Sequence, residues 1–405
     1  MAELLFLAHR IPCPPAKGDK IRAYHLLSHL ARAHVVHLGC LIDDADDWRH
    51  VDELRRLCHE CHFAALTRTR RLMRAAGALA RNEAITVAAL RDPGLAGWVG
   101  DLLRRRPVDG VLAYSSGMAQ FLAAVPSTAT RIGDFVDVDS EKWRQLASGR
   151  AWPWSWLYRR ESERLRTYDR AAADWCDHCL FVSPAEAQLF QELIPAARAK
   201  ARIIPNGVDS AYFAPEAVHP CPFPPGGPVL AFTGDMGYWP NEDAVVWFAR
   251  AVLPTLRASR PDLRFVVVGR APGRGLRRAA PRLGMALTGT VPDVRPFLAH
   301  AALVVAPLRL ARGVPNKVLE AMAMAKAVVA TPAAVAGLRL RPGHDVLVAQ
   351  TPSAFAEAVA GLLEARRAAA LGAQARARVV ADYAWQSSFG RLDRLIAARP
   401  RPPEV

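Results

Sequence analysis

Apolar and polar positions alternate regularly along this chain, with short runs of strand type separated by longer amphipathic segments of helix type. Helical patterns at residues 21–32, 93–106 and 155–175 lie between the runs of the first half. Strands separated by helices pair in parallel, because a parallel pair needs a crossover connection. The first half therefore predicts a doubly wound parallel sheet, with strands at 4–8, 34–42, 61–66, 108–114, 130–136 and 179–183.

A break in the pattern near the middle of the chain indicates two domains. Residues 215–228 are so rich in Pro and Gly that neither a helix nor a central strand is expected there. The alternation then restarts, with strands expected at 229–233, 263–269, 302–307, 327–331 and 345–348, and helices at 243–256, 315–325 and 352–381. We predict two Rossmann-like α/β domains, 1–214 and 229–384, joined by the linker 215–228. A ligand would bind in a cleft between them, at the carboxyl ends of the strands.

Composition narrows the class of protein. The net charge of +15 suggests an anionic partner, but few of the 53 Lys and Arg residues are Lys, and no nucleic-acid-binding module is visible. We therefore expect no nucleic acid partner. No apolar run reaches the ~18 residues of a membrane span, and the start does not resemble a secretory signal. We expect a cytoplasmic protein.

The cysteines include two C-x-x-C pairs, Cys58/Cys61 and Cys176/Cys179, which could nominally share a zinc ion. Each pair sits where a helix pattern runs into a strand, and the two strands would lie on opposite sides of the sheet. Buried, reduced thiols are the ordinary alternative in the cytosol. We expect no metal and no other cofactor.

The most informative stretch is residues 306–323, APLRLARGVPNKVLEAMA. A strand is followed by a loop with Gly313 and by a helix that starts near Pro315. The free N–H groups and positive dipole end of that helix, with Arg312 and Lys317, form a site suited to a diphosphate. Glu320 lies deeper and could accept hydrogen bonds from ribose hydroxyls. The alternative is a helix with a charged first turn and a solvated Glu320.

These residues resemble the donor-binding segment of family 4 retaining glycosyltransferases, which have the GT-B fold. IPNGVD at 204–209 and FTGDMGYWPNEDA at 232–244 resemble the same family. More narrowly, PAKGDKIR at 15–22 and DFVDVDSEKW at 134–143 are similar to a sugar transferase subgroup found with PEP-CTERM/exosortase exopolysaccharide systems.

The resemblance implies a nucleotide diphosphate sugar as donor, a saccharide or lipid-linked acceptor, and retention of anomeric configuration without a metal. It also implies that a helix at about 385–398 packs back on the N-terminal domain. The family usually has two acids eight positions apart; the second corresponds to Glu320, but Arg312 stands in place of the first. Arg312 and Lys317 would then stabilise the leaving diphosphate, with Gly313 and Val314 at the donor.

Other loops at strand ends fit this interpretation. The backbone at Gly234 could approach a donor phosphate, and Arg270 could contact phosphate or base or lie on the surface. We expect Asn241 to cap the following helix. In the first domain, Gly18 would approach the donor, and Lys17, Asp19 and Lys20 would face the acceptor side, where the two Lys could neutralise phosphates. The G-x-x-x-x-G-K-[ST] spacing of a Walker loop is absent.

Acidic residues follow the strand at 130–136. Asp134, Asp137 and Asp139 invite a metal interpretation, but hard cations need more oxygen ligands than these. We expect Asp137 at the catalytic centre and Asp139 and Ser115 on the acceptor side, orienting the acceptor. No general base is identified, and the leaving phosphate itself could take the acceptor proton.

Two interpretations stay open for the Arg-rich residues 68–81 and for WPWSW at 152–156. They could form a basic, aromatic surface for an anionic membrane or a lipid-linked acceptor, peripheral at the inner face of the membrane. Alternatively, the Trp residues lie in the core and the Arg residues in solvent. Two alternatives to the transferase function also remain: a sugar-nucleotide epimerase on the same fold, and a non-catalytic subunit that binds a nucleotide sugar.

Overall fold

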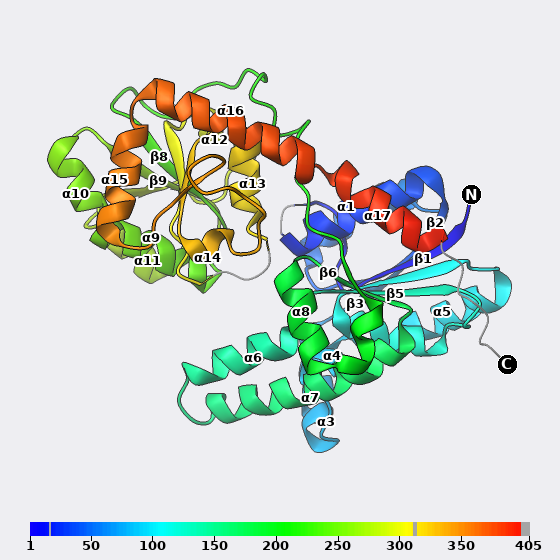
Figure 1. Ribbon diagram of the computed structural model, residues 1–405. Coiled ribbons are helices and arrows are strands. Elements are labelled where there is room, and N and C mark those ends of the chain that lie inside the picture. The colour runs from blue at the N-terminus through cyan, green and yellow to red at the C-terminus, as the bar shows by residue number, and fades with distance from the viewer. Residues whose placement is uncertain (16–17, 311–313, 398–405) are drawn as a thin grey trace. The chain divides into compact units, whose positions relative to one another are not determined.

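A computed structural model describes residues 1–15, 18–310 and 314–397, and it divides the chain into two compact units (Figure 1). Unit 1 comprises Met1–Pro205 and the residues from Phe389 onward, and unit 2 comprises Asn206–Ser388. The boundary thus falls before the predicted linker. Residues 215–228 belong to unit 2, where Arg264 donates hydrogen bonds to the carbonyls of Pro224 and Gly227.

Unit 1 contains a seven-stranded, wholly parallel sheet in the order β3-β2-β1-β4-β5-β6-β7. The six strands expected from the apolar runs are all present, and a short seventh was missed. The strands are β1 (Glu3–Ala8), β2 (Val35–Ile42), β3 (Glu60–Ala65), β4 (Gly110–Tyr114), β5 (Thr130–Val136), β6 (His178–Phe181) and β7 (Ala201–Ile203).

Helices cover both faces of this sheet because its strands present apolar side chains to both. In β1, Leu4, Phe6 and Ala8 pack on one side, and Leu5 and Leu7 on the other. The helices are α1 (Gly18–Ala33), α2 (Val51–Leu57), α3 (Arg68–Ala80), α4 (Ile85–Leu90), α5 (Pro93–Arg105), α6 (Asp139–Ser148), α7 (Trp154–Trp175) and α8 (Pro184–Leu193), with 3-10 turns at Ala45–His50, Ser116–Ala124 and Pro195–Lys200.

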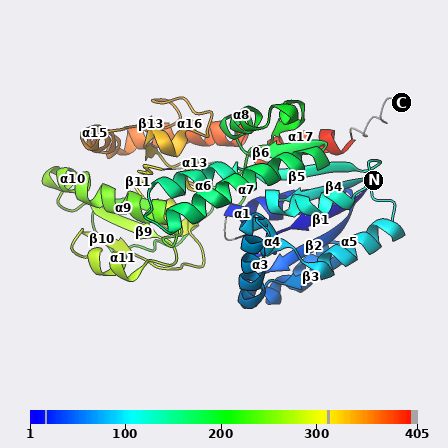
Figure 2. The same ribbon diagram turned by 90° about the horizontal axis from the view of Figure 1, so that it is seen from below.

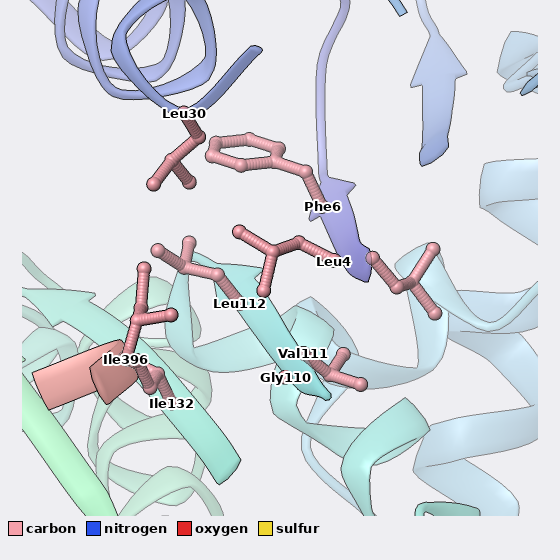
Figure 3. A pocket seen from close by; sticks show the side chains of 9 residues that line it. Leu4, Phe6, Leu30, Gly110, Val111, Leu112, Ile132 and Ile396 are labelled. Carbon is pink, nitrogen blue, oxygen red and sulfur yellow. The ribbon is translucent and has the colours of Figure 1, made fainter. Parts of the chain in front are cut away.

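The last helix, α17 (Trp385–Ala397), contributes its C-terminal part to unit 1. The Phe389 ring stacks on His29 of α1 at 4.1 Å between centroids, and His29 Nε2 lies 2.7 Å from a carboxylate oxygen of Asp393. Ile396 lines a small apolar pocket with side chains of β1, β4, β5 and α1 (Figure 3). The pocket has no charged lining, so it is a packing gap in the core.

Unit 2 contains a six-stranded parallel sheet in the order β10-β9-β8-β11-β12-β13. Of these strands, β9, β10, β11 and β13 are labelled in Figure 2. Its strands are β8 (Val229–Thr233), β9 (Arg264–Val268), β10 (Met285–Leu287), β11 (Leu303–Ala306), β12 (Val328–Ala330) and β13 (Leu347–Val348). The helices are α9 (Trp239–Ala251), α10 (Leu253–Ser259), α11 (Arg274–Ala279), α12 (Arg295–His300), α13 (Asn316–Ala323), α14 (Pro332–Val335), α15 (Pro352–Leu362) and α16 (Ala365–Asp382).

Two α/β units with parallel sheets confirm the predicted fold class. The helix expected at 352–381 is two helices, α15 and α16, and β10 was not predicted. None of the helices within residues 1–15, 18–310 and 314–397 combines the length and apolar character needed to cross a bilayer.

The N-terminal unit also contains a buried ion pair that the sequence did not reveal. Arg22 of α1 and Asp134 of β5 are both fully buried, with the guanidinium Nε 2.8 Å and Nη2 3.1 Å from the two carboxylate oxygens. Arg22 Nη1 also donates to the carbonyl of Ile204 at 2.9 Å. This pair joins α1, β5 and the end of unit 1, and it removes Asp134 from the acids available at the sheet edge.

Candidate functional site

In unit 2 a lysine from α13 reaches the carboxyl end of β8. Lys317 Nζ donates a hydrogen bond of 2.5 Å to Asn241 Oδ1 and lies 4.2 Å from the centre of the Phe232 ring. Gly234 follows β8, and a Cβ there would lie 2.8 Å from Lys317 Nζ and 3.0 Å from Asn241 Nδ2. The absence of a side chain at Gly234 therefore makes room for the ammonium group, which has two further N–H donors to offer a ligand.

Asn241 was predicted as a helix cap, and this prediction is wrong. The helix α9 already begins at Trp239, and Asn241 lies buried inside its first turn. Its Nδ2 donates to the Asp235 carbonyl at 2.8 Å while its Oδ1 accepts from Lys317. Asn241 thus holds the lysine in place. This role could not be predicted, because the two residues are far apart in the chain and no local pattern links them.

Burial changes the acidity of the two charged residues on α13. Loss of solvation lowers the pKa of Lys317 to about 7, and the neighbouring Glu320 carboxylate opposes that shift. Loss of solvation likewise raises the pKa of Glu320 to about 7, opposed by Lys317. Both groups are therefore poised near neutrality, which is typical of groups that interact with a charged ligand.

No side chain in the described part of the sequence caps the first turn of α13. Pro315 occupies the N-cap position, Val318 N donates to the Pro315 carbonyl at 3.0 Å, and Asn316 Oδ1 is buried without a hydrogen-bond partner among the described residues. The Val314 side chain packs into the core of unit 2, so only its backbone could contact a donor. The predicted donor residues Arg312 and Gly313 lie outside the described residues.

Two arginines near this edge of the sheet are ion-paired. Arg270 Nε lies 2.9 Å and Nη2 2.5 Å from the same carboxylate oxygen of Asp235, and 42% of the Arg270 side chain is exposed, so this guanidinium lies at the surface but is paired with an acid. Arg309 pairs with Asp243 of α9. The charge that either Arg could offer a phosphate is thereby shared with a carboxylate.

In unit 1 the end of β5 has an unusual backbone. Val136 has a φ of 68°, a conformation that a β-branched residue rarely adopts, and Asp137 N donates to the Phe135 carbonyl at 2.8 Å. Such strain costs about 1–3 kcal/mol and is concentrated at functional sites. It presents Asp137 at the carboxyl end of the sheet, where its Oδ1 is buried without a hydrogen-bond partner among the described residues.

The surroundings of Asp137 favour its protonated form. Burial, helped by the nearby Glu186 and Asp139 carboxylates, raises the pKa of Asp137 to about 6, while Lys142 and Arg22 oppose the shift. Glu186 lies in the first turn of α8, where Ser183 Oγ accepts a hydrogen bond from Glu186 N at 3.3 Å and caps the helix. The Glu186 carboxylate accepts from Val138 N at 2.8 Å, which fixes the loop after Asp137.

The other predicted acceptor-side residues of β4 and β5 lie at the same sheet edge. Asp139 opens α6 and lies 3.5 Å from Lys142 Nζ. Ser115 follows β4 with a φ of 81°, another strained position, and its N–H donates to the Asp134 carbonyl at 2.9 Å. His9, which the sequence analysis missed although it directly follows β1, stacks on Tyr114 at 5.6 Å between ring centroids.

The Lys-rich turn before α1 differs from the expectation. Lys20 is buried and its Nζ lies 2.7 Å from a carboxylate oxygen of Asp47, so its charge is neutralised within unit 1. Asp47 belongs to the acidic run at 43–47, which from sequence alone would be expected to form a loop exposed to solvent. Gly18 is exposed at the start of α1, and Asp19 follows it in that helix. Lys17 lies outside the described residues.

Few of the described side chains are arranged so that they could bind a metal ion together. Cys61 lies in β3 and Cys179 lies in β6, and four strands (β2, β1, β4 and β5) lie between them in the sheet. The two C-x-x-C pairs therefore cannot share an ion. Among the described residues one group has ligand atoms close enough together, Cys13, His50 and Glu53. Cys13 Sγ lies 2.9 Å from Glu53 Oε2, and burial raises the pKa of this thiol to about 12, which opposes the thiolate that a metal requires.

Two protein-family models match the sequence of this chain. The family model described as Glycosyltransferase Family 4 matches residues 18–212, and that described as Glycosyl transferases group 1 matches residues 227–365. No curated protein matches the chain in sequence.

Several solved structures share the fold over 98% of this chain. HepE of Anabaena in complex with UDP-glucose has a TM-score of 0.68 at 14% identity and is covered over 100% of its length. Sucrose-phosphate synthase from Thermosynechococcus elongatus has a TM-score of 0.68 at 17% identity, also covered over 100%. A glycosyltransferase from Rickettsia africae has a TM-score of 0.66 at 12% identity, covered over 98%.

Proposed function

Because this chain is a glycosyltransferase with the GT-B fold, we propose that it transfers a sugar from a nucleotide diphosphate donor to a hydroxyl of a saccharide or lipid-linked acceptor. The proposal includes retention of the anomeric configuration, which rests on the resemblance of residues 306–323 to family 4 retaining enzymes, and a place in exopolysaccharide synthesis, which rests on the motifs at 15–22 and 134–143. A similar fold crystallised with UDP-glucose supports the class of donor.

The observation that carries the donor assignment is the position of Lys317. Its ammonium lies at the carboxyl end of β8, beside a glycine, and one side-chain amide orients it. A cation held in this way can stabilise the negative charge that develops on a departing diphosphate without reorganising during the reaction. The first turn of α13 adds its backbone N–H groups, and Glu320 would accept hydrogen bonds from the ribose hydroxyls. Arg312 and Gly313 complete the proposed phosphate site.

In unit 1 we assign the acceptor to the residues that follow β4 and β5. Asp137 positions the acceptor hydroxyl, with Asp139 and Ser115 beside it. The leaving phosphate takes the acceptor proton, so no separate base is required. A lipid-linked acceptor would place the protein at the inner face of a membrane, as a peripheral cytoplasmic enzyme.

Thermal stabilisation by UDP, GDP and ADP, followed by their sugars, tests the donor assignment. A ligand at 100 times its Kd stabilises the folded protein by about 2.7 kcal/mol, so the matching nucleotide raises Tm measurably. Glu320→Ala should abolish this shift, and Glu357→Ala, an exposed glutamate of α15, should retain it. A full shift in Glu320→Ala would contradict the ribose role.

A turnover assay separates the proposed function from its alternatives. Transfer to an added acceptor, with release of the nucleotide diphosphate, is expected. Release of a free epimerised sugar without an acceptor would identify an epimerase. Binding without transfer or donor hydrolysis would identify a non-catalytic subunit.

A further inference from the structure

The helix α3 presents its apolar face to solvent. Leu72 and Met73 are each 63% exposed and Leu79 is 43% exposed, and Ala76 and Ala80 are exposed beside them. These positions recur at the spacing of one helical face. The opposite face is directed into unit 1, where Ala78 is fully buried and Arg74 Nη2 lies 2.8 Å from a carboxylate oxygen of Asp92. An apolar stripe normally faces a core, so this one lacks its partner.

The charged residues of α3 itself are all positive. Arg68, Arg70 and Arg71 are exposed, and none forms an ion pair with any described part of the chain. The helix contains no acidic residue. A helix with exposed Leu and Met between Arg side chains has the pattern of segments that lie in the interface of an anionic bilayer.

A second exposed apolar group lies next to the end of α3. Trp152 is 80% exposed, and Trp154 and Trp156 are each 56% exposed, so these residues are not core tryptophans. Arg160 lies one turn after Trp156 on the same face of α7, and its Nη2 donates to the carbonyls of Ala78 and Glu83 at 3.2 and 3.1 Å. The first turns of α7 therefore adjoin the C-terminal end of α3. Tryptophan is enriched where a protein meets the headgroup region of a bilayer.

We propose that α3 and the Trp152–Trp156 turn form one membrane-docking surface that inserts the side chains of Leu72, Met73, Leu79 and the three Trp residues among anionic lipid headgroups. In both views of the molecule α3 stands at the margin of unit 1 (Figures 1 and 2). A second copy of this chain fits the surface less well. A two-fold symmetric contact through α3 would add the same Arg side chains from the other copy and no acidic residue of that helix to pair with them.

The docking surface is tested by flotation of the full chain with vesicles of phosphatidylcholine alone and with about one third phosphatidylglycerol. We expect binding only to the anionic vesicles, weakening with added salt. Leu72→Asp/Met73→Asp and Trp154→Ala/Trp156→Ala should each lose this binding. Arg68→Gln/Arg71→Gln should weaken it by about five-fold per charge removed.

A matched control carries the same added charge at exposed apolar positions of unit 2. Val218→Asp/Val380→Asp replaces side chains that are 98% and 44% exposed, and it should bind anionic vesicles like the wild type. Because all the substituted side chains are exposed, Tm should change little, and a melting curve for each variant checks the fold. If either the Trp variant or the Leu/Met variant fails to fold, the other variant still tests the surface.

Several outcomes would overturn the proposal: no binding of the wild type to anionic vesicles, equal binding to phosphatidylcholine alone, or wild-type binding by both apolar variants. Self-association of the wild type in sedimentation, abolished by Leu72→Asp/Met73→Asp without any vesicle binding, would assign the surface to a second copy. The nucleotide-induced Tm shift, measured on the same variants, should be unchanged. Failure of docking and failure of the donor assignment therefore give separate signals.

Discussion

Lys317 and Asn241 come from helices far apart in the sequence, yet a hydrogen bond of 2.5 Å joins the lysine ammonium to the asparagine Oδ1 at the end of β8. The contact orients a cation that burial would otherwise destabilise. Among the described residues the Lys317 ammonium has one hydrogen-bond partner, the Asn241 amide, so it is incompletely satisfied and gains from a bound anion. This relationship is the physical basis of the proposed donor site.

Lys317→Ala is expected to lower kcat by about 10²–10³, because it removes a fixed positive charge from the departing diphosphate. Donor affinity should fall less than kcat, since the charge develops during the reaction. Single-turnover and steady-state rates measure the two effects. Arg250→Ala, which removes an exposed charge from α9, serves as the control. Unchanged turnover in Lys317→Ala would exclude the proposed role.

Binding of a nucleoside diphosphate should weaken as pH rises through neutrality. The pKa of Lys317 is lowered by burial to about 7, so the free protein loses this positive charge between about pH 6 and 8. Bound diphosphate favours the protonated form, and the Kd should therefore rise by up to about ten-fold per pH unit above the pKa. Calorimetry between pH 7 and 9 measures this slope. Lys317→Met should show a shallower profile, because Glu320, whose pKa burial raises to about 7, still titrates in this range. A slope equal to that of the wild type would point to a group other than Lys317.

Gly234→Ala should weaken donor binding by about ten-fold or more, the magnitude of one lost hydrogen bond to a charged group. The added Cβ would lie 2.8 Å from Lys317 Nζ and would displace the ammonium. Gly275→Ala in α11 is the matched control, because a Cβ there meets nothing within 4 Å. Equal nucleotide-induced Tm shifts in the two variants would contradict the close packing of Lys317 on Gly234.

Short-range patterns predicted most of the fold. The run at residues 4–8 became β1 with one residue added, and the helix expected at 155–175 is α7, because the periodic spacing of apolar positions reflects the local structure directly. The strands β7 and β10 were not predicted, because a strand of three residues is too short to show a periodic pattern of apolar positions. The helix predicted from residue 243 in fact begins at Trp239. Pro240 is tolerated there because it lies in the first turn of α9.

The site was less predictable because its contacts depend on tertiary distances. Lys317 and Glu320 could be singled out from the motif, whereas the Asn241 contact could not. Lys20 shows an error of the opposite kind. We expected it to bind a ligand because Lys is rare in this chain, but its carboxylate partner Asp47 could not be identified from the sequence. The orientation of Trp154 was open for the same reason, because an apolar ring is compatible with either a core or an interface.

Arg22→Met should destabilise the protein by about 3–5 kcal/mol, because it leaves the Asp134 carboxylate buried and uncompensated. Urea unfolding followed by circular dichroism measures this loss. The double variant Arg22→Met/Asp134→Leu should recover much of the stability, since it removes both charges together. A double variant less stable than Arg22→Met would show that the pair is not the main contact of either residue.

Asp137→Asn should reduce kcat/KM for the acceptor while leaving the nucleotide-induced Tm shift intact, because the residue lies in unit 1 and the proposed donor groups in unit 2. Burial raises the pKa of Asp137 to about 6, so the wild-type rate should fall as pH decreases through 6 if the ionised form accepts the acceptor hydroxyl. The amide cannot ionise, so the variant should lose this limb of the pH profile. Asp174→Asn, at an exposed position of α7, should behave like the wild type. An Asp137→Asn variant with normal acceptor kinetics would mean that the strained turn at Val136 serves the fold alone.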